Sequence, residues 1–331
     1  MADATIYEVA RRAGVSVATV SRAFNGGPVA ASTKARVLAA AAELGYRPHR
    51  LAQGLAAGRS WAVGVVIPDA AGPLYGRFER GLSEALFSQG YTYLASESRR
   101  QLQREFDLVE EFLSRKVDAL VLVGSGASME ALTKRFGHLP PTVLVEREGP
   151  GRAAAHLRVD HEDAAYRATR HLLDRGHRRI AHVLGPRRAG REREAGFLRA
   201  LAEAGQRPFA LIPGDFSEES GYDAGRALLA KKARPDAVFL ANDRMALGFY
   251  KAAWELGVKI PDQVSVVGFD DLRFAAYLTP PLTTMRQPAE VLGRRAGAAV
   301  LQLLAGKRPQ RSVLPCELVA RASVRHEGGE V

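Results

Sequence analysis

The sequence predicts a small all-helical N-terminal unit followed by a larger α/β core of two lobes. Three features support this division: apolar residues at helical spacing up to residue 44, a break at Arg47-Pro48, and short apolar runs alternating with helical segments from Trp61 onward. The residue before a proline is disfavoured in an α-helix, so Arg47 marks the end of the helical unit. We expect the boundaries 1–47 for the helical unit, 48–60 for a linker and 61–331 for the core.

Residues 6–13 have the pattern of an amphipathic helix that stops at a tight turn. Ile6, Val9, Ala10 and Ala13 share one face because about 3.6 residues complete a helical turn. Gly14 tolerates the left-handed backbone that such a turn needs, so the helix is expected to end there.

A second helix is expected from Ser16, whose hydroxyl suits an N-cap. Val20 and Phe24 lie four residues apart and face the first helix. The expected outward residues are Val17, Ala18, Ser21, Arg22 and Asn25. A small, polar face of this kind fits the DNA major groove, where an arginine reads guanine and small apolar groups touch a thymine methyl. The pattern favours a helix-turn-helix, although an ordinary helical hairpin has the same apolar spacing.

A third helix and a short linker segment follow. Residues Val37, Leu38, Ala41 and Leu44 predict a helix that closes the bundle. In residues 49–59, Leu51 and Leu55 stand four residues apart and Gly58 is the expected stop. Helices shorter than roughly 12 residues are marginal in water, so this segment is expected to fold on its target.

Positive charge is concentrated in the helical unit. The formal net charge is +11, and residues 1–60 hold eight Lys or Arg against three Asp or Glu. A basic excess there favours a polyanionic partner, although a solvated basic surface would give the same count.

The core pattern predicts parallel sheets with helices on both faces. The expected strands are 63–68, 91–96, 118–124, 142–145, 156–160, 180–185, 209–212, 237–242 and 264–268. An interruption near residues 146–160 divides them into two sheets. Ligands of such folds lie at the carboxyl ends of the strands, in a cleft between facing lobes.

The number of cysteines and the lengths of the apolar stretches limit the cellular compartments expected for the protein. Cys316 is the single cysteine, which leaves no intramolecular disulfide and no paired-cysteine zinc site. No signal-peptide pattern and no stretch near ~18 apolar residues occurs. We expect a cytoplasmic protein outside the membrane, with no metal and no cofactor.

Several motifs together resemble one family. They are residues 9–25, VARRAGVSVATVSRAFN, then LGYRP at 44–48, GHRRI at 176–180, ANDRMA at 241–246, VVGFDD at 266–271 and TPPLTT at 279–284. The chain resembles, over nearly its whole length, the lactose/galactose repressor family of bacterial transcription regulators. The resemblance implies a DNA-binding headpiece, a hinge helix and a core similar to periplasmic sugar-binding proteins. It also implies a homodimer on a near-palindromic operator, most often acting as a repressor.

The resemblance assigns DNA contacts residue by residue. Base-reading positions correspond to Val17, Ala18 and Arg22, and backbone-contacting or cap positions to Thr5, Tyr7, Ser16, Thr19, Ser21 and Asn25. In the hinge, Leu51 and Leu55 are expected at the DNA, where apolar wedges kink the minor groove. The chain departs from the family pattern at two positions. Gly54 lies inside the hinge helix and weakens it by up to ~1 kcal/mol relative to alanine. Ala30 replaces the usual capping serine, so the third helix is expected to start near Ser32.

The family's cleft positions form a chemically coherent set in this chain. They correspond to Asp69, Tyr75, Asp163, Arg193, Phe216, Asn242, Asp270 and Gln287. The carboxylates accept hydroxyl hydrogen bonds, Arg193 donates in a planar fork, and Phe216 offers an apolar face to a ring. Taken alone, each carboxylate equally suits a solvated loop or a helix cap, and Tyr75 equally suits packing.

The expected effector is a sugar or sugar derivative. An amide side chain at Asn242 suits hydroxyl groups, whereas purine-responsive relatives commonly have glycine there. A nucleobase or nucleoside remains the alternative effector. The chain also lacks the C-terminal leucine-heptad segment of tetrameric relatives, so a dimer is expected.

Three other functions fit the sequence less well than this one. Gly124-Ser-Gly126 has part of a dinucleotide fingerprint, but Met129 stands where the third glycine is needed. His161-Glu162-Asp163 could supply metal ligands or an acid/base group, but no histidine cluster matches it, and no nucleophile elbow occurs. No catalytic residue is therefore assigned. A transport binding protein and an unliganded architectural DNA binder fit the basic headpiece and the polar cleft less well.

Overall fold

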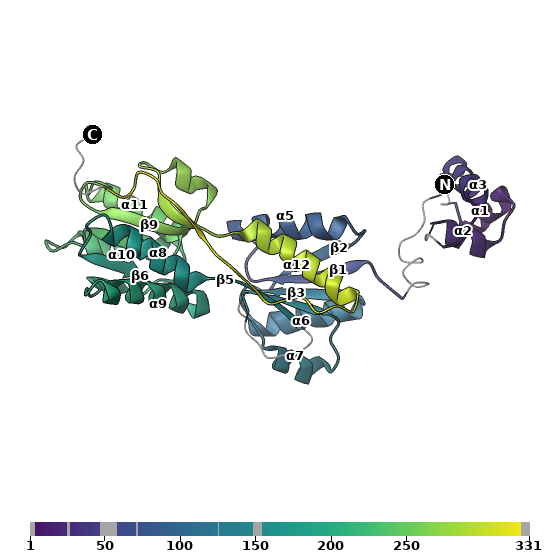
Figure 1. Cartoon of the computed structure of the whole chain (residues 1–331), viewed down its shortest axis with the longest axis horizontal. Coiled ribbons are helices and arrows are strands. Elements are labelled where there is room, and N and C mark those ends of the chain that lie inside the picture. Colours follow the sequence, from purple (N-terminus) through teal and green to yellow (C-terminus); the bar gives the residue numbers. More distant parts are fainter. Residues whose placement is uncertain are drawn as a thin grey trace.

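The computed structural model describes residues 4–24, 27–46, 58–70, 72–124, 126–147 and 154–325. It contains a three-helix headpiece, which lies apart from a core of two α/β lobes set end to end (Figure 1). The expected division into a helical unit and a bilobal core is thus present. The hinge residues Leu51 and Leu55, and Asn25, lie outside the described residues.

Local hydrogen bonds set the start of each of the first two helices. The headpiece helices are α1 (Ile6–Ala13), α2 (Val17–Phe24) and α3 (Ala31–Glu43). Thr5 and Glu8 form a reciprocal capping box, and Gly14 ends α1 with a left-handed φ of 64°. The Ser16 hydroxyl accepts from the Thr19 backbone N–H at 3.2 Å, as a residue at this turn should.

Two expectations for α3 are wrong. The helix begins at Ala31 rather than near Ser32, and Ala30 provides no side-chain cap. Leu38 and Leu44 are 44% and 36% exposed, so they do not close the bundle. The other two predicted residues, Val37 and Ala41, are buried in the bundle, and Ala40 joins them where a leucine was expected, because α3 turns its alanine-rich face toward α1 and α2.

Each lobe is a six-stranded sheet between two helical layers. The N-terminal lobe contains β1 (Ala62–Ile67), α5 (Pro73–Phe87), β2 (Thr92–Glu97), α6 (Leu102–Ser114), β3 (Ala119–Val123), α7 (Met129–Phe136), β4 (Thr142–Val145), β5 (Ala154–Val159), α12 (Ala289–Leu304) and β11 (Ser312–Leu314). The C-terminal lobe contains α8 (His161–Leu173), β6 (Ile180–Val183), α9 (Arg187–Glu203), β7 (Ala210–Ile212), α10 (Glu218–Leu229), β8 (Ala237–Leu240), α11 (Asp243–Glu255), β9 (Ser265–Asp270), the short 3₁₀ helix η1 (Arg273–Tyr277), β10 (Thr283–Arg286) and β12 (Glu317–Val319).

The strand orders are β11-β5-β4-β3-β1-β2 and β12-β10-β9-β8-β6-β7. Every pairing is parallel except that of β10 with β12. All nine strands expected from the sequence are present, and β10, β11 and β12 are additional. Because neighbouring strands are parallel, their carboxyl ends gather at one edge of each sheet.

Within the lobes, helix pairs pack backbone against backbone at glycines. A Cβ added to Gly293 of α12 would lie 1.9 Å from the Phe78 carbonyl oxygen of α5. Equivalent approaches occur at Gly196 between α9 and α8, and at Gly248 between α11 and α10. Contacts this close leave little room for one helix of a pair to slide along the other.

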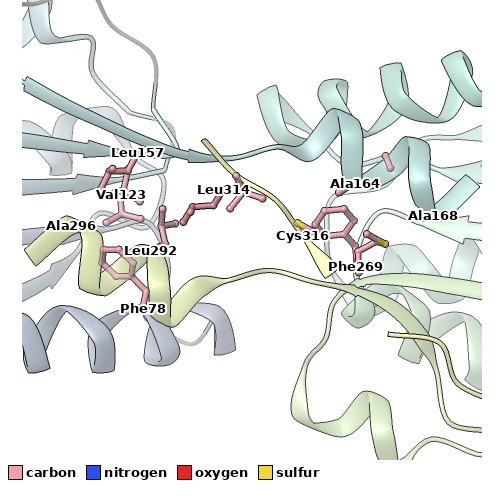
Figure 2. Close-up of a cluster of buried hydrophobic side chains, with 14 of the residues drawn as sticks. Phe78, Val123, Leu157, Ala164, Ala168, Phe269, Leu292, Ala296, Leu314 and Cys316 are labelled. Carbon is pink, nitrogen blue, oxygen red and sulfur yellow. The ribbon is translucent and has the colours of Figure 1, made fainter. Parts of the chain in front are cut away.

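Three chain segments cross between the lobes, and a hydrophobic cluster follows them. The crossings lie between β5 and α8, between β10 and α12, and between β11 and β12. Figure 2 shows Leu157, Leu292 and Leu314 on one side and Phe269 and Cys316 on the other. The buried side chains therefore continue from one lobe into the other.

No helix in the described ranges is both long and apolar enough to span a bilayer. Among the same residues, no group of three or more His, Cys, Asp or Glu side chains is arranged to hold a metal ion.

The C-terminal lobe buries a histidine completely within its sheet. The ring of His182 on β6 stacks on Phe239 of β8, with centroids 4.6 Å apart and planes 7° from parallel. A carbonyl only accepts, so His182 Nδ1–H donates to the Phe239 oxygen at 2.8 Å and the ring is neutral. Burial lowers the pKa of His182 from 6.5 to about 4.

This shift predicts a stability that falls in mild acid. Above pH 6.5 His182 is neutral in both the folded and unfolded states; between pH 6.5 and 4 only the unfolded state takes up the proton. The free energy of unfolding should therefore drop by about 3 kcal/mol over that range from this group. Chemical denaturation at several pH values measures the drop. In His182→Phe, which keeps the stacked ring, the slope should be shallower; an unchanged slope contradicts the assignment.

Candidate functional site

The headpiece presents its second helix outward. Ala18 and Arg22 of α2 are exposed, as expected, and Tyr7 on α1 is 68% exposed. Val17 is half-buried and packs against the bundle core. It is therefore less available for contact with DNA than its place on the predicted outward face indicated. Thr5 and Ser16 are exposed, while Thr19 and Ser21 are half-buried.

A cavity of about 200 Å³ lies between the two lobes, where the carboxyl ends of β1, β3, β4, β6, β8 and β9 converge. Seven of the eight predicted cleft residues line it. These are Asp69, Tyr75, Arg193, Phe216, Asn242, Asp270 and Gln287.

The eighth predicted residue, Asp163, does not line the cavity. Its carboxylate lies 3.9 Å from Arg167 and is 44% exposed. His161, two residues earlier at the start of α8, lines the cavity instead. A helix turns about 100° per residue, so only one of these two side chains faces inward. The sequence indicated His161 only as a metal ligand or an acid/base group, and its place in the cleft was not predicted.

Arg193 on α9 forms the buried floor of the cavity. Its guanidinium donates to the Ala241 carbonyl and to Nδ1 of His161, the latter at 3.3 Å. It also lies 3.8 Å from the Asp270 carboxylate and 3.6 Å from the centre of the Phe269 ring. A fully buried charge costs free energy unless it is paired, and these contacts supply the pairing.

Burial shifts the pKa values of both Arg193 and Asp270. Desolvation lowers the pKa of Arg193, and the Asp270 carboxylate opposes that fall. Desolvation also raises the pKa of Asp270, opposed by Arg193 and by Gln287, whose Nε2 donates to Asp270 at 2.6 Å. Perturbed groups of this kind in a cavity are typical of functional sites.

Glu146 reaches across from the N-terminal lobe. Its carboxylate accepts from His161 Nε2 at 2.9 Å and from Arg188 at 3.2 Å. Although desolvation alone would raise the pKa of Glu146, the nearby His161 and Arg188 make it lower than usual. Because Arg193 donates to His161 Nδ1, His161 carries its proton on Nε2. Glu146, His161, Arg193 and Asp270 thus form one polar chain between the lobes.

Both ends of the Asn242 amide form hydrogen bonds with neighbouring parts of the protein. Its Oδ1 caps α11 by accepting from the Met245 N–H at 2.9 Å, and its Nδ2 donates to the Phe216 carbonyl at 3.1 Å. The Phe216 ring lies directly over Gly185, since a Cβ there would be 2.2 Å from the ring. Asn242 therefore holds in place the loop that carries Phe216.

Backbone strain gathers around the cavity. Non-glycine residues with left-handed φ include five that line it: Arg100, Glu146, Arg187, Phe216 and Asp270. Each such residue costs on the order of 1–3 kcal/mol, and strain of this kind clusters at binding sites.

Sequence reasoning missed two buried carboxylates beside the site. Asp243 accepts from the Thr284 hydroxyl at 2.6 Å and the Leu272 N–H at 2.7 Å, and burial raises its pKa well above the usual value. Asp271 pairs with Arg286 and Arg321 at 2.7 and 2.6 Å. Both fix the end of β9, which presents Asp270.

Comparison with known proteins agrees with this architecture. Residues 5–49 match the model for bacterial regulatory proteins of the lacI family, and residues 169–324 match the periplasmic binding protein-like domain. The repressor PurR of Edwardsiella ictaluri is 35% identical over 330 residues, covering 97% of both chains. Catabolite control protein A of Priestia megaterium is 34% identical over 297 residues, covering 88% of this chain and 90% of its own.

The chain belongs to the lacI family. Among solved structures, a Lac repressor dimer bound to operator and the anti-inducer ONPF superposes on this LacI-family chain with a TM-score of 0.86. That pair is 30% identical and covers 97% of this chain and 99% of the other. The regulator CelR in complex with cellobiose is 31% identical, with a TM-score of 0.73 and coverage of 97% and 99%.

Two glycines allow a matched test of the turn between β6 and α9, which lies at the cavity between the lobes. Gly190→Ala would set a Cβ 1.8 Å from the Gly185 carbonyl, a backbone atom, so the turn must move. In Gly185→Ala the three atoms nearest the new Cβ all belong to the Phe216 ring, a side chain that we expect to swing away. We expect Gly190→Ala to cost about 1 to 3 kcal/mol of stability and Gly185→Ala less than about 1 kcal/mol. Thermal unfolding measures both.

Crystal structures of the two variants complete that test. In Gly185→Ala the Phe216 ring should leave its place over residue 185, while the α9 backbone stays in position. Equal unfolding temperatures for both variants would contradict the described turn.

Proposed function

We propose that this chain is a transcriptional repressor that binds a near-palindromic operator as a homodimer under the control of a small molecule in the cleft. The observation that carries the proposal is the full-length match: 97% of the chain aligns with the repressors PurR and CytR at 32–36% identity. Both the headpiece and the bilobal core are included. Residues 1–47 are proposed as the headpiece, 48–60 as the hinge and 61–331 as the regulatory core.

The DNA contacts are proposed on the outward face of the headpiece. Arg22 and Ala18 enter the major groove from α2, with Val17 at its edge. The polar group of Thr5, Tyr7, Ser16, Thr19, Ser21 and Asn25 contacts the backbone. Leu51 and Leu55 wedge into the minor groove at the centre of the operator.

A homodimer is supported by exposed aromatic side chains on the core. Phe87, Trp254 and Tyr277 are 81%, 80% and 76% exposed. Side chains of this size are enriched at protein interfaces. The Lac repressor neighbour is itself described as a dimer on its operator.

The cleft is proposed to bind a sugar or sugar derivative. Phe216 lines the cavity and offers an apolar surface to a sugar ring. Asp270 also lines the cavity, and its carboxylate accepts a hydrogen bond from Gln287. Related regulators have been solved with cellobiose and with ribose. Asn242 supports this choice less than its chemistry indicated, because both ends of its amide already have internal partners. A nucleobase or nucleoside stays the alternative.

We do not propose an enzyme. At the partial dinucleotide fingerprint, a Cβ on Gly126 would meet the Glu105 carboxylate, which forms a buried ion pair with Arg147 at 2.7 Å. The N-terminus of α7 is capped by Ser128, so a phosphate would compete with that hydroxyl. A regulator of operator DNA works in the cytoplasm, which is the proposed location.

Removal of the Arg22 side chain should alter sequence readout. Arg22→Ala is expected to lose about 1 to 3 kcal/mol of operator affinity at one base position of each half-site. The measurement is a binding titration on an operator selected from a randomised duplex library, and on single-base variants of it. Arg12→Ala is the matched control, since Arg12 is paired with Glu43 at 2.8 Å. Equal weakening of Arg22→Ala on random DNA would contradict the role.

Asp270 is the anchor to test in the cleft. Thermal-shift screening against sugars, sugar phosphates and nucleobases first names a binding compound. For that compound, Asp270→Ala should lower the affinity by roughly 10- to 100-fold, because a charge-assisted hydrogen bond is lost. Asp163→Ala, whose carboxylate lies outside the cavity, is the matched control. Calorimetry that finds full affinity in Asp270→Ala would overturn the cleft assignment.

A further inference from the structure

We propose that the cleft ligand carries an anionic group, a phosphoryl or carboxylate on a hydroxylated ring, and that Arg187 and Arg188 bind this group. This inference rests on the proposed function, because it names the ligand class of the same cleft. It narrows the sugar or sugar derivative proposed above to one with a negative charge, and it names the residues that bind that charge.

The charges that line the cavity carry the argument. Each lining carboxylate already has a cationic neighbour: Asp270 has Arg193, Glu146 has Arg188, and Asp69 lies 3.6 Å from Arg100. Of the lining arginines, Arg244 is held by Glu218 through two hydrogen bonds of 2.8 and 2.6 Å. Arg187 is exposed at the cavity and has no acidic partner in the described part of the chain. The lining charge that remains unneutralised is therefore positive.

The position of Arg187 adds to that positive potential. It is the first residue of the 17-residue helix α9, and Arg188 follows it. This first turn has no acidic residue, and Pro186 gives no side-chain cap. Backbone N–H groups at a helix N-terminus favour anions and disfavour cations. Glu146 and Glu192, at 3.2 and 3.5 Å, already offset the charge of Arg188. The positive charge of Arg187 at this position is therefore the one that an anionic ligand would offset.

A buried donor at the same cavity is an independent sign of a ligand. Arg193 lines the cavity with its side chain 5% exposed, and its Nε has no hydrogen-bond partner within the described residues. Buried donors are rarely left without a partner, and such a group calls for an explanation. An anionic ligand supplies acceptor oxygens to this wall of arginines.

Glu146 shows what such an anion replaces. Its carboxylate accepts from Arg188 and from His161 Nε2, which is the pair of donors that a ligand anion needs. The ligand group and Glu146 therefore compete for the same donors. Loss of the Glu146 charge should favour an anionic ligand and leave a neutral one nearly unaffected.

The test is calorimetric titration of the full-length protein with defined probes. Glucose 6-phosphate and ribose 5-phosphate represent phosphoryl groups, gluconate and glucuronate represent carboxylates, and glucose, ribose, cellobiose and hypoxanthine are uncharged. Inorganic phosphate reports binding of an anion alone. We expect at least one anionic sugar to bind more tightly than its uncharged counterpart and than inorganic phosphate; the phosphoryl and carboxylate arms decide between the two sources.

Variants then locate the anion. Arg187→Ala and Arg187→Gln should weaken the anionic probe by roughly 10- to 100-fold. Glu146→Gln should strengthen it severalfold. Arg191→Ala, an exposed arginine on the same helix but outside the cavity lining, is the matched control and should change nothing.

Three results would overturn the inference: binding of uncharged probes only, binding of no probe, or equal affinity in Arg187→Ala and wild type. Operator binding of the same variants without probe keeps the two proposals distinguishable. If operator is bound and an uncharged sugar releases it, the proposed function stands and the anionic ligand is refuted. If wild-type protein binds no operator, the proposed function fails whatever the ligand.

Discussion

The buried guanidinium of Arg193 is the interaction on which the rest of the site depends. It lies on the Phe269 ring and contacts the ends of β8 and β9 together with His161 at the start of α8. A buried charge is costly unless it is paired, so the ends of several elements must lie close enough to Arg193 to supply its partners. Through His161 the chain of contacts continues to Glu146 in the other lobe. The floor of the cavity and the polar contact between the lobes thus belong to one network.

The remainder of the core consists of two blocks, one on each side of that network. Backbone contacts at Gly293, Gly196 and Gly248 lock the helix pairs within each lobe. Three chain segments connect the lobes, and buried apolar side chains such as Leu314 and Phe269 follow them (Figure 2). A ligand that contacts both blocks can alter the angle between them, but only if it binds one angle more tightly than another. A closed hydrophobic seam beside a polar cavity suits such a rigid-body change.

Much of this arrangement could be predicted from residue patterns, and the failures have physical causes. Nine strands were predicted because their apolar runs are bounded by turns. Strands β11 and β12 are three residues each and pair with partners far away in the sequence, so local patterning gives no signal for them. Leu38 has the right spacing for a core residue, yet α3 presents alanines inward and leaves it exposed. The family correspondence gave Asp163, whereas His161 lines the cavity, because a correspondence of positions does not fix the rotation of a helix start. Partners such as Asp243 and Asp271 depend on tertiary contacts that spacing does not reveal.

The most direct test of the central claim is the reciprocity of coupling between cleft and operator. For a compound shown to bind the cleft, two ratios are measured: operator Kd with and without compound, and compound Kd with and without operator. Linkage requires the same factor in both, typically 5- to 150-fold. In His161→Leu, which cuts the polar chain between Arg193 and Glu146, both factors should fall together toward one. Full coupling in that variant, or a compound that binds wild type without changing operator affinity, would contradict the account.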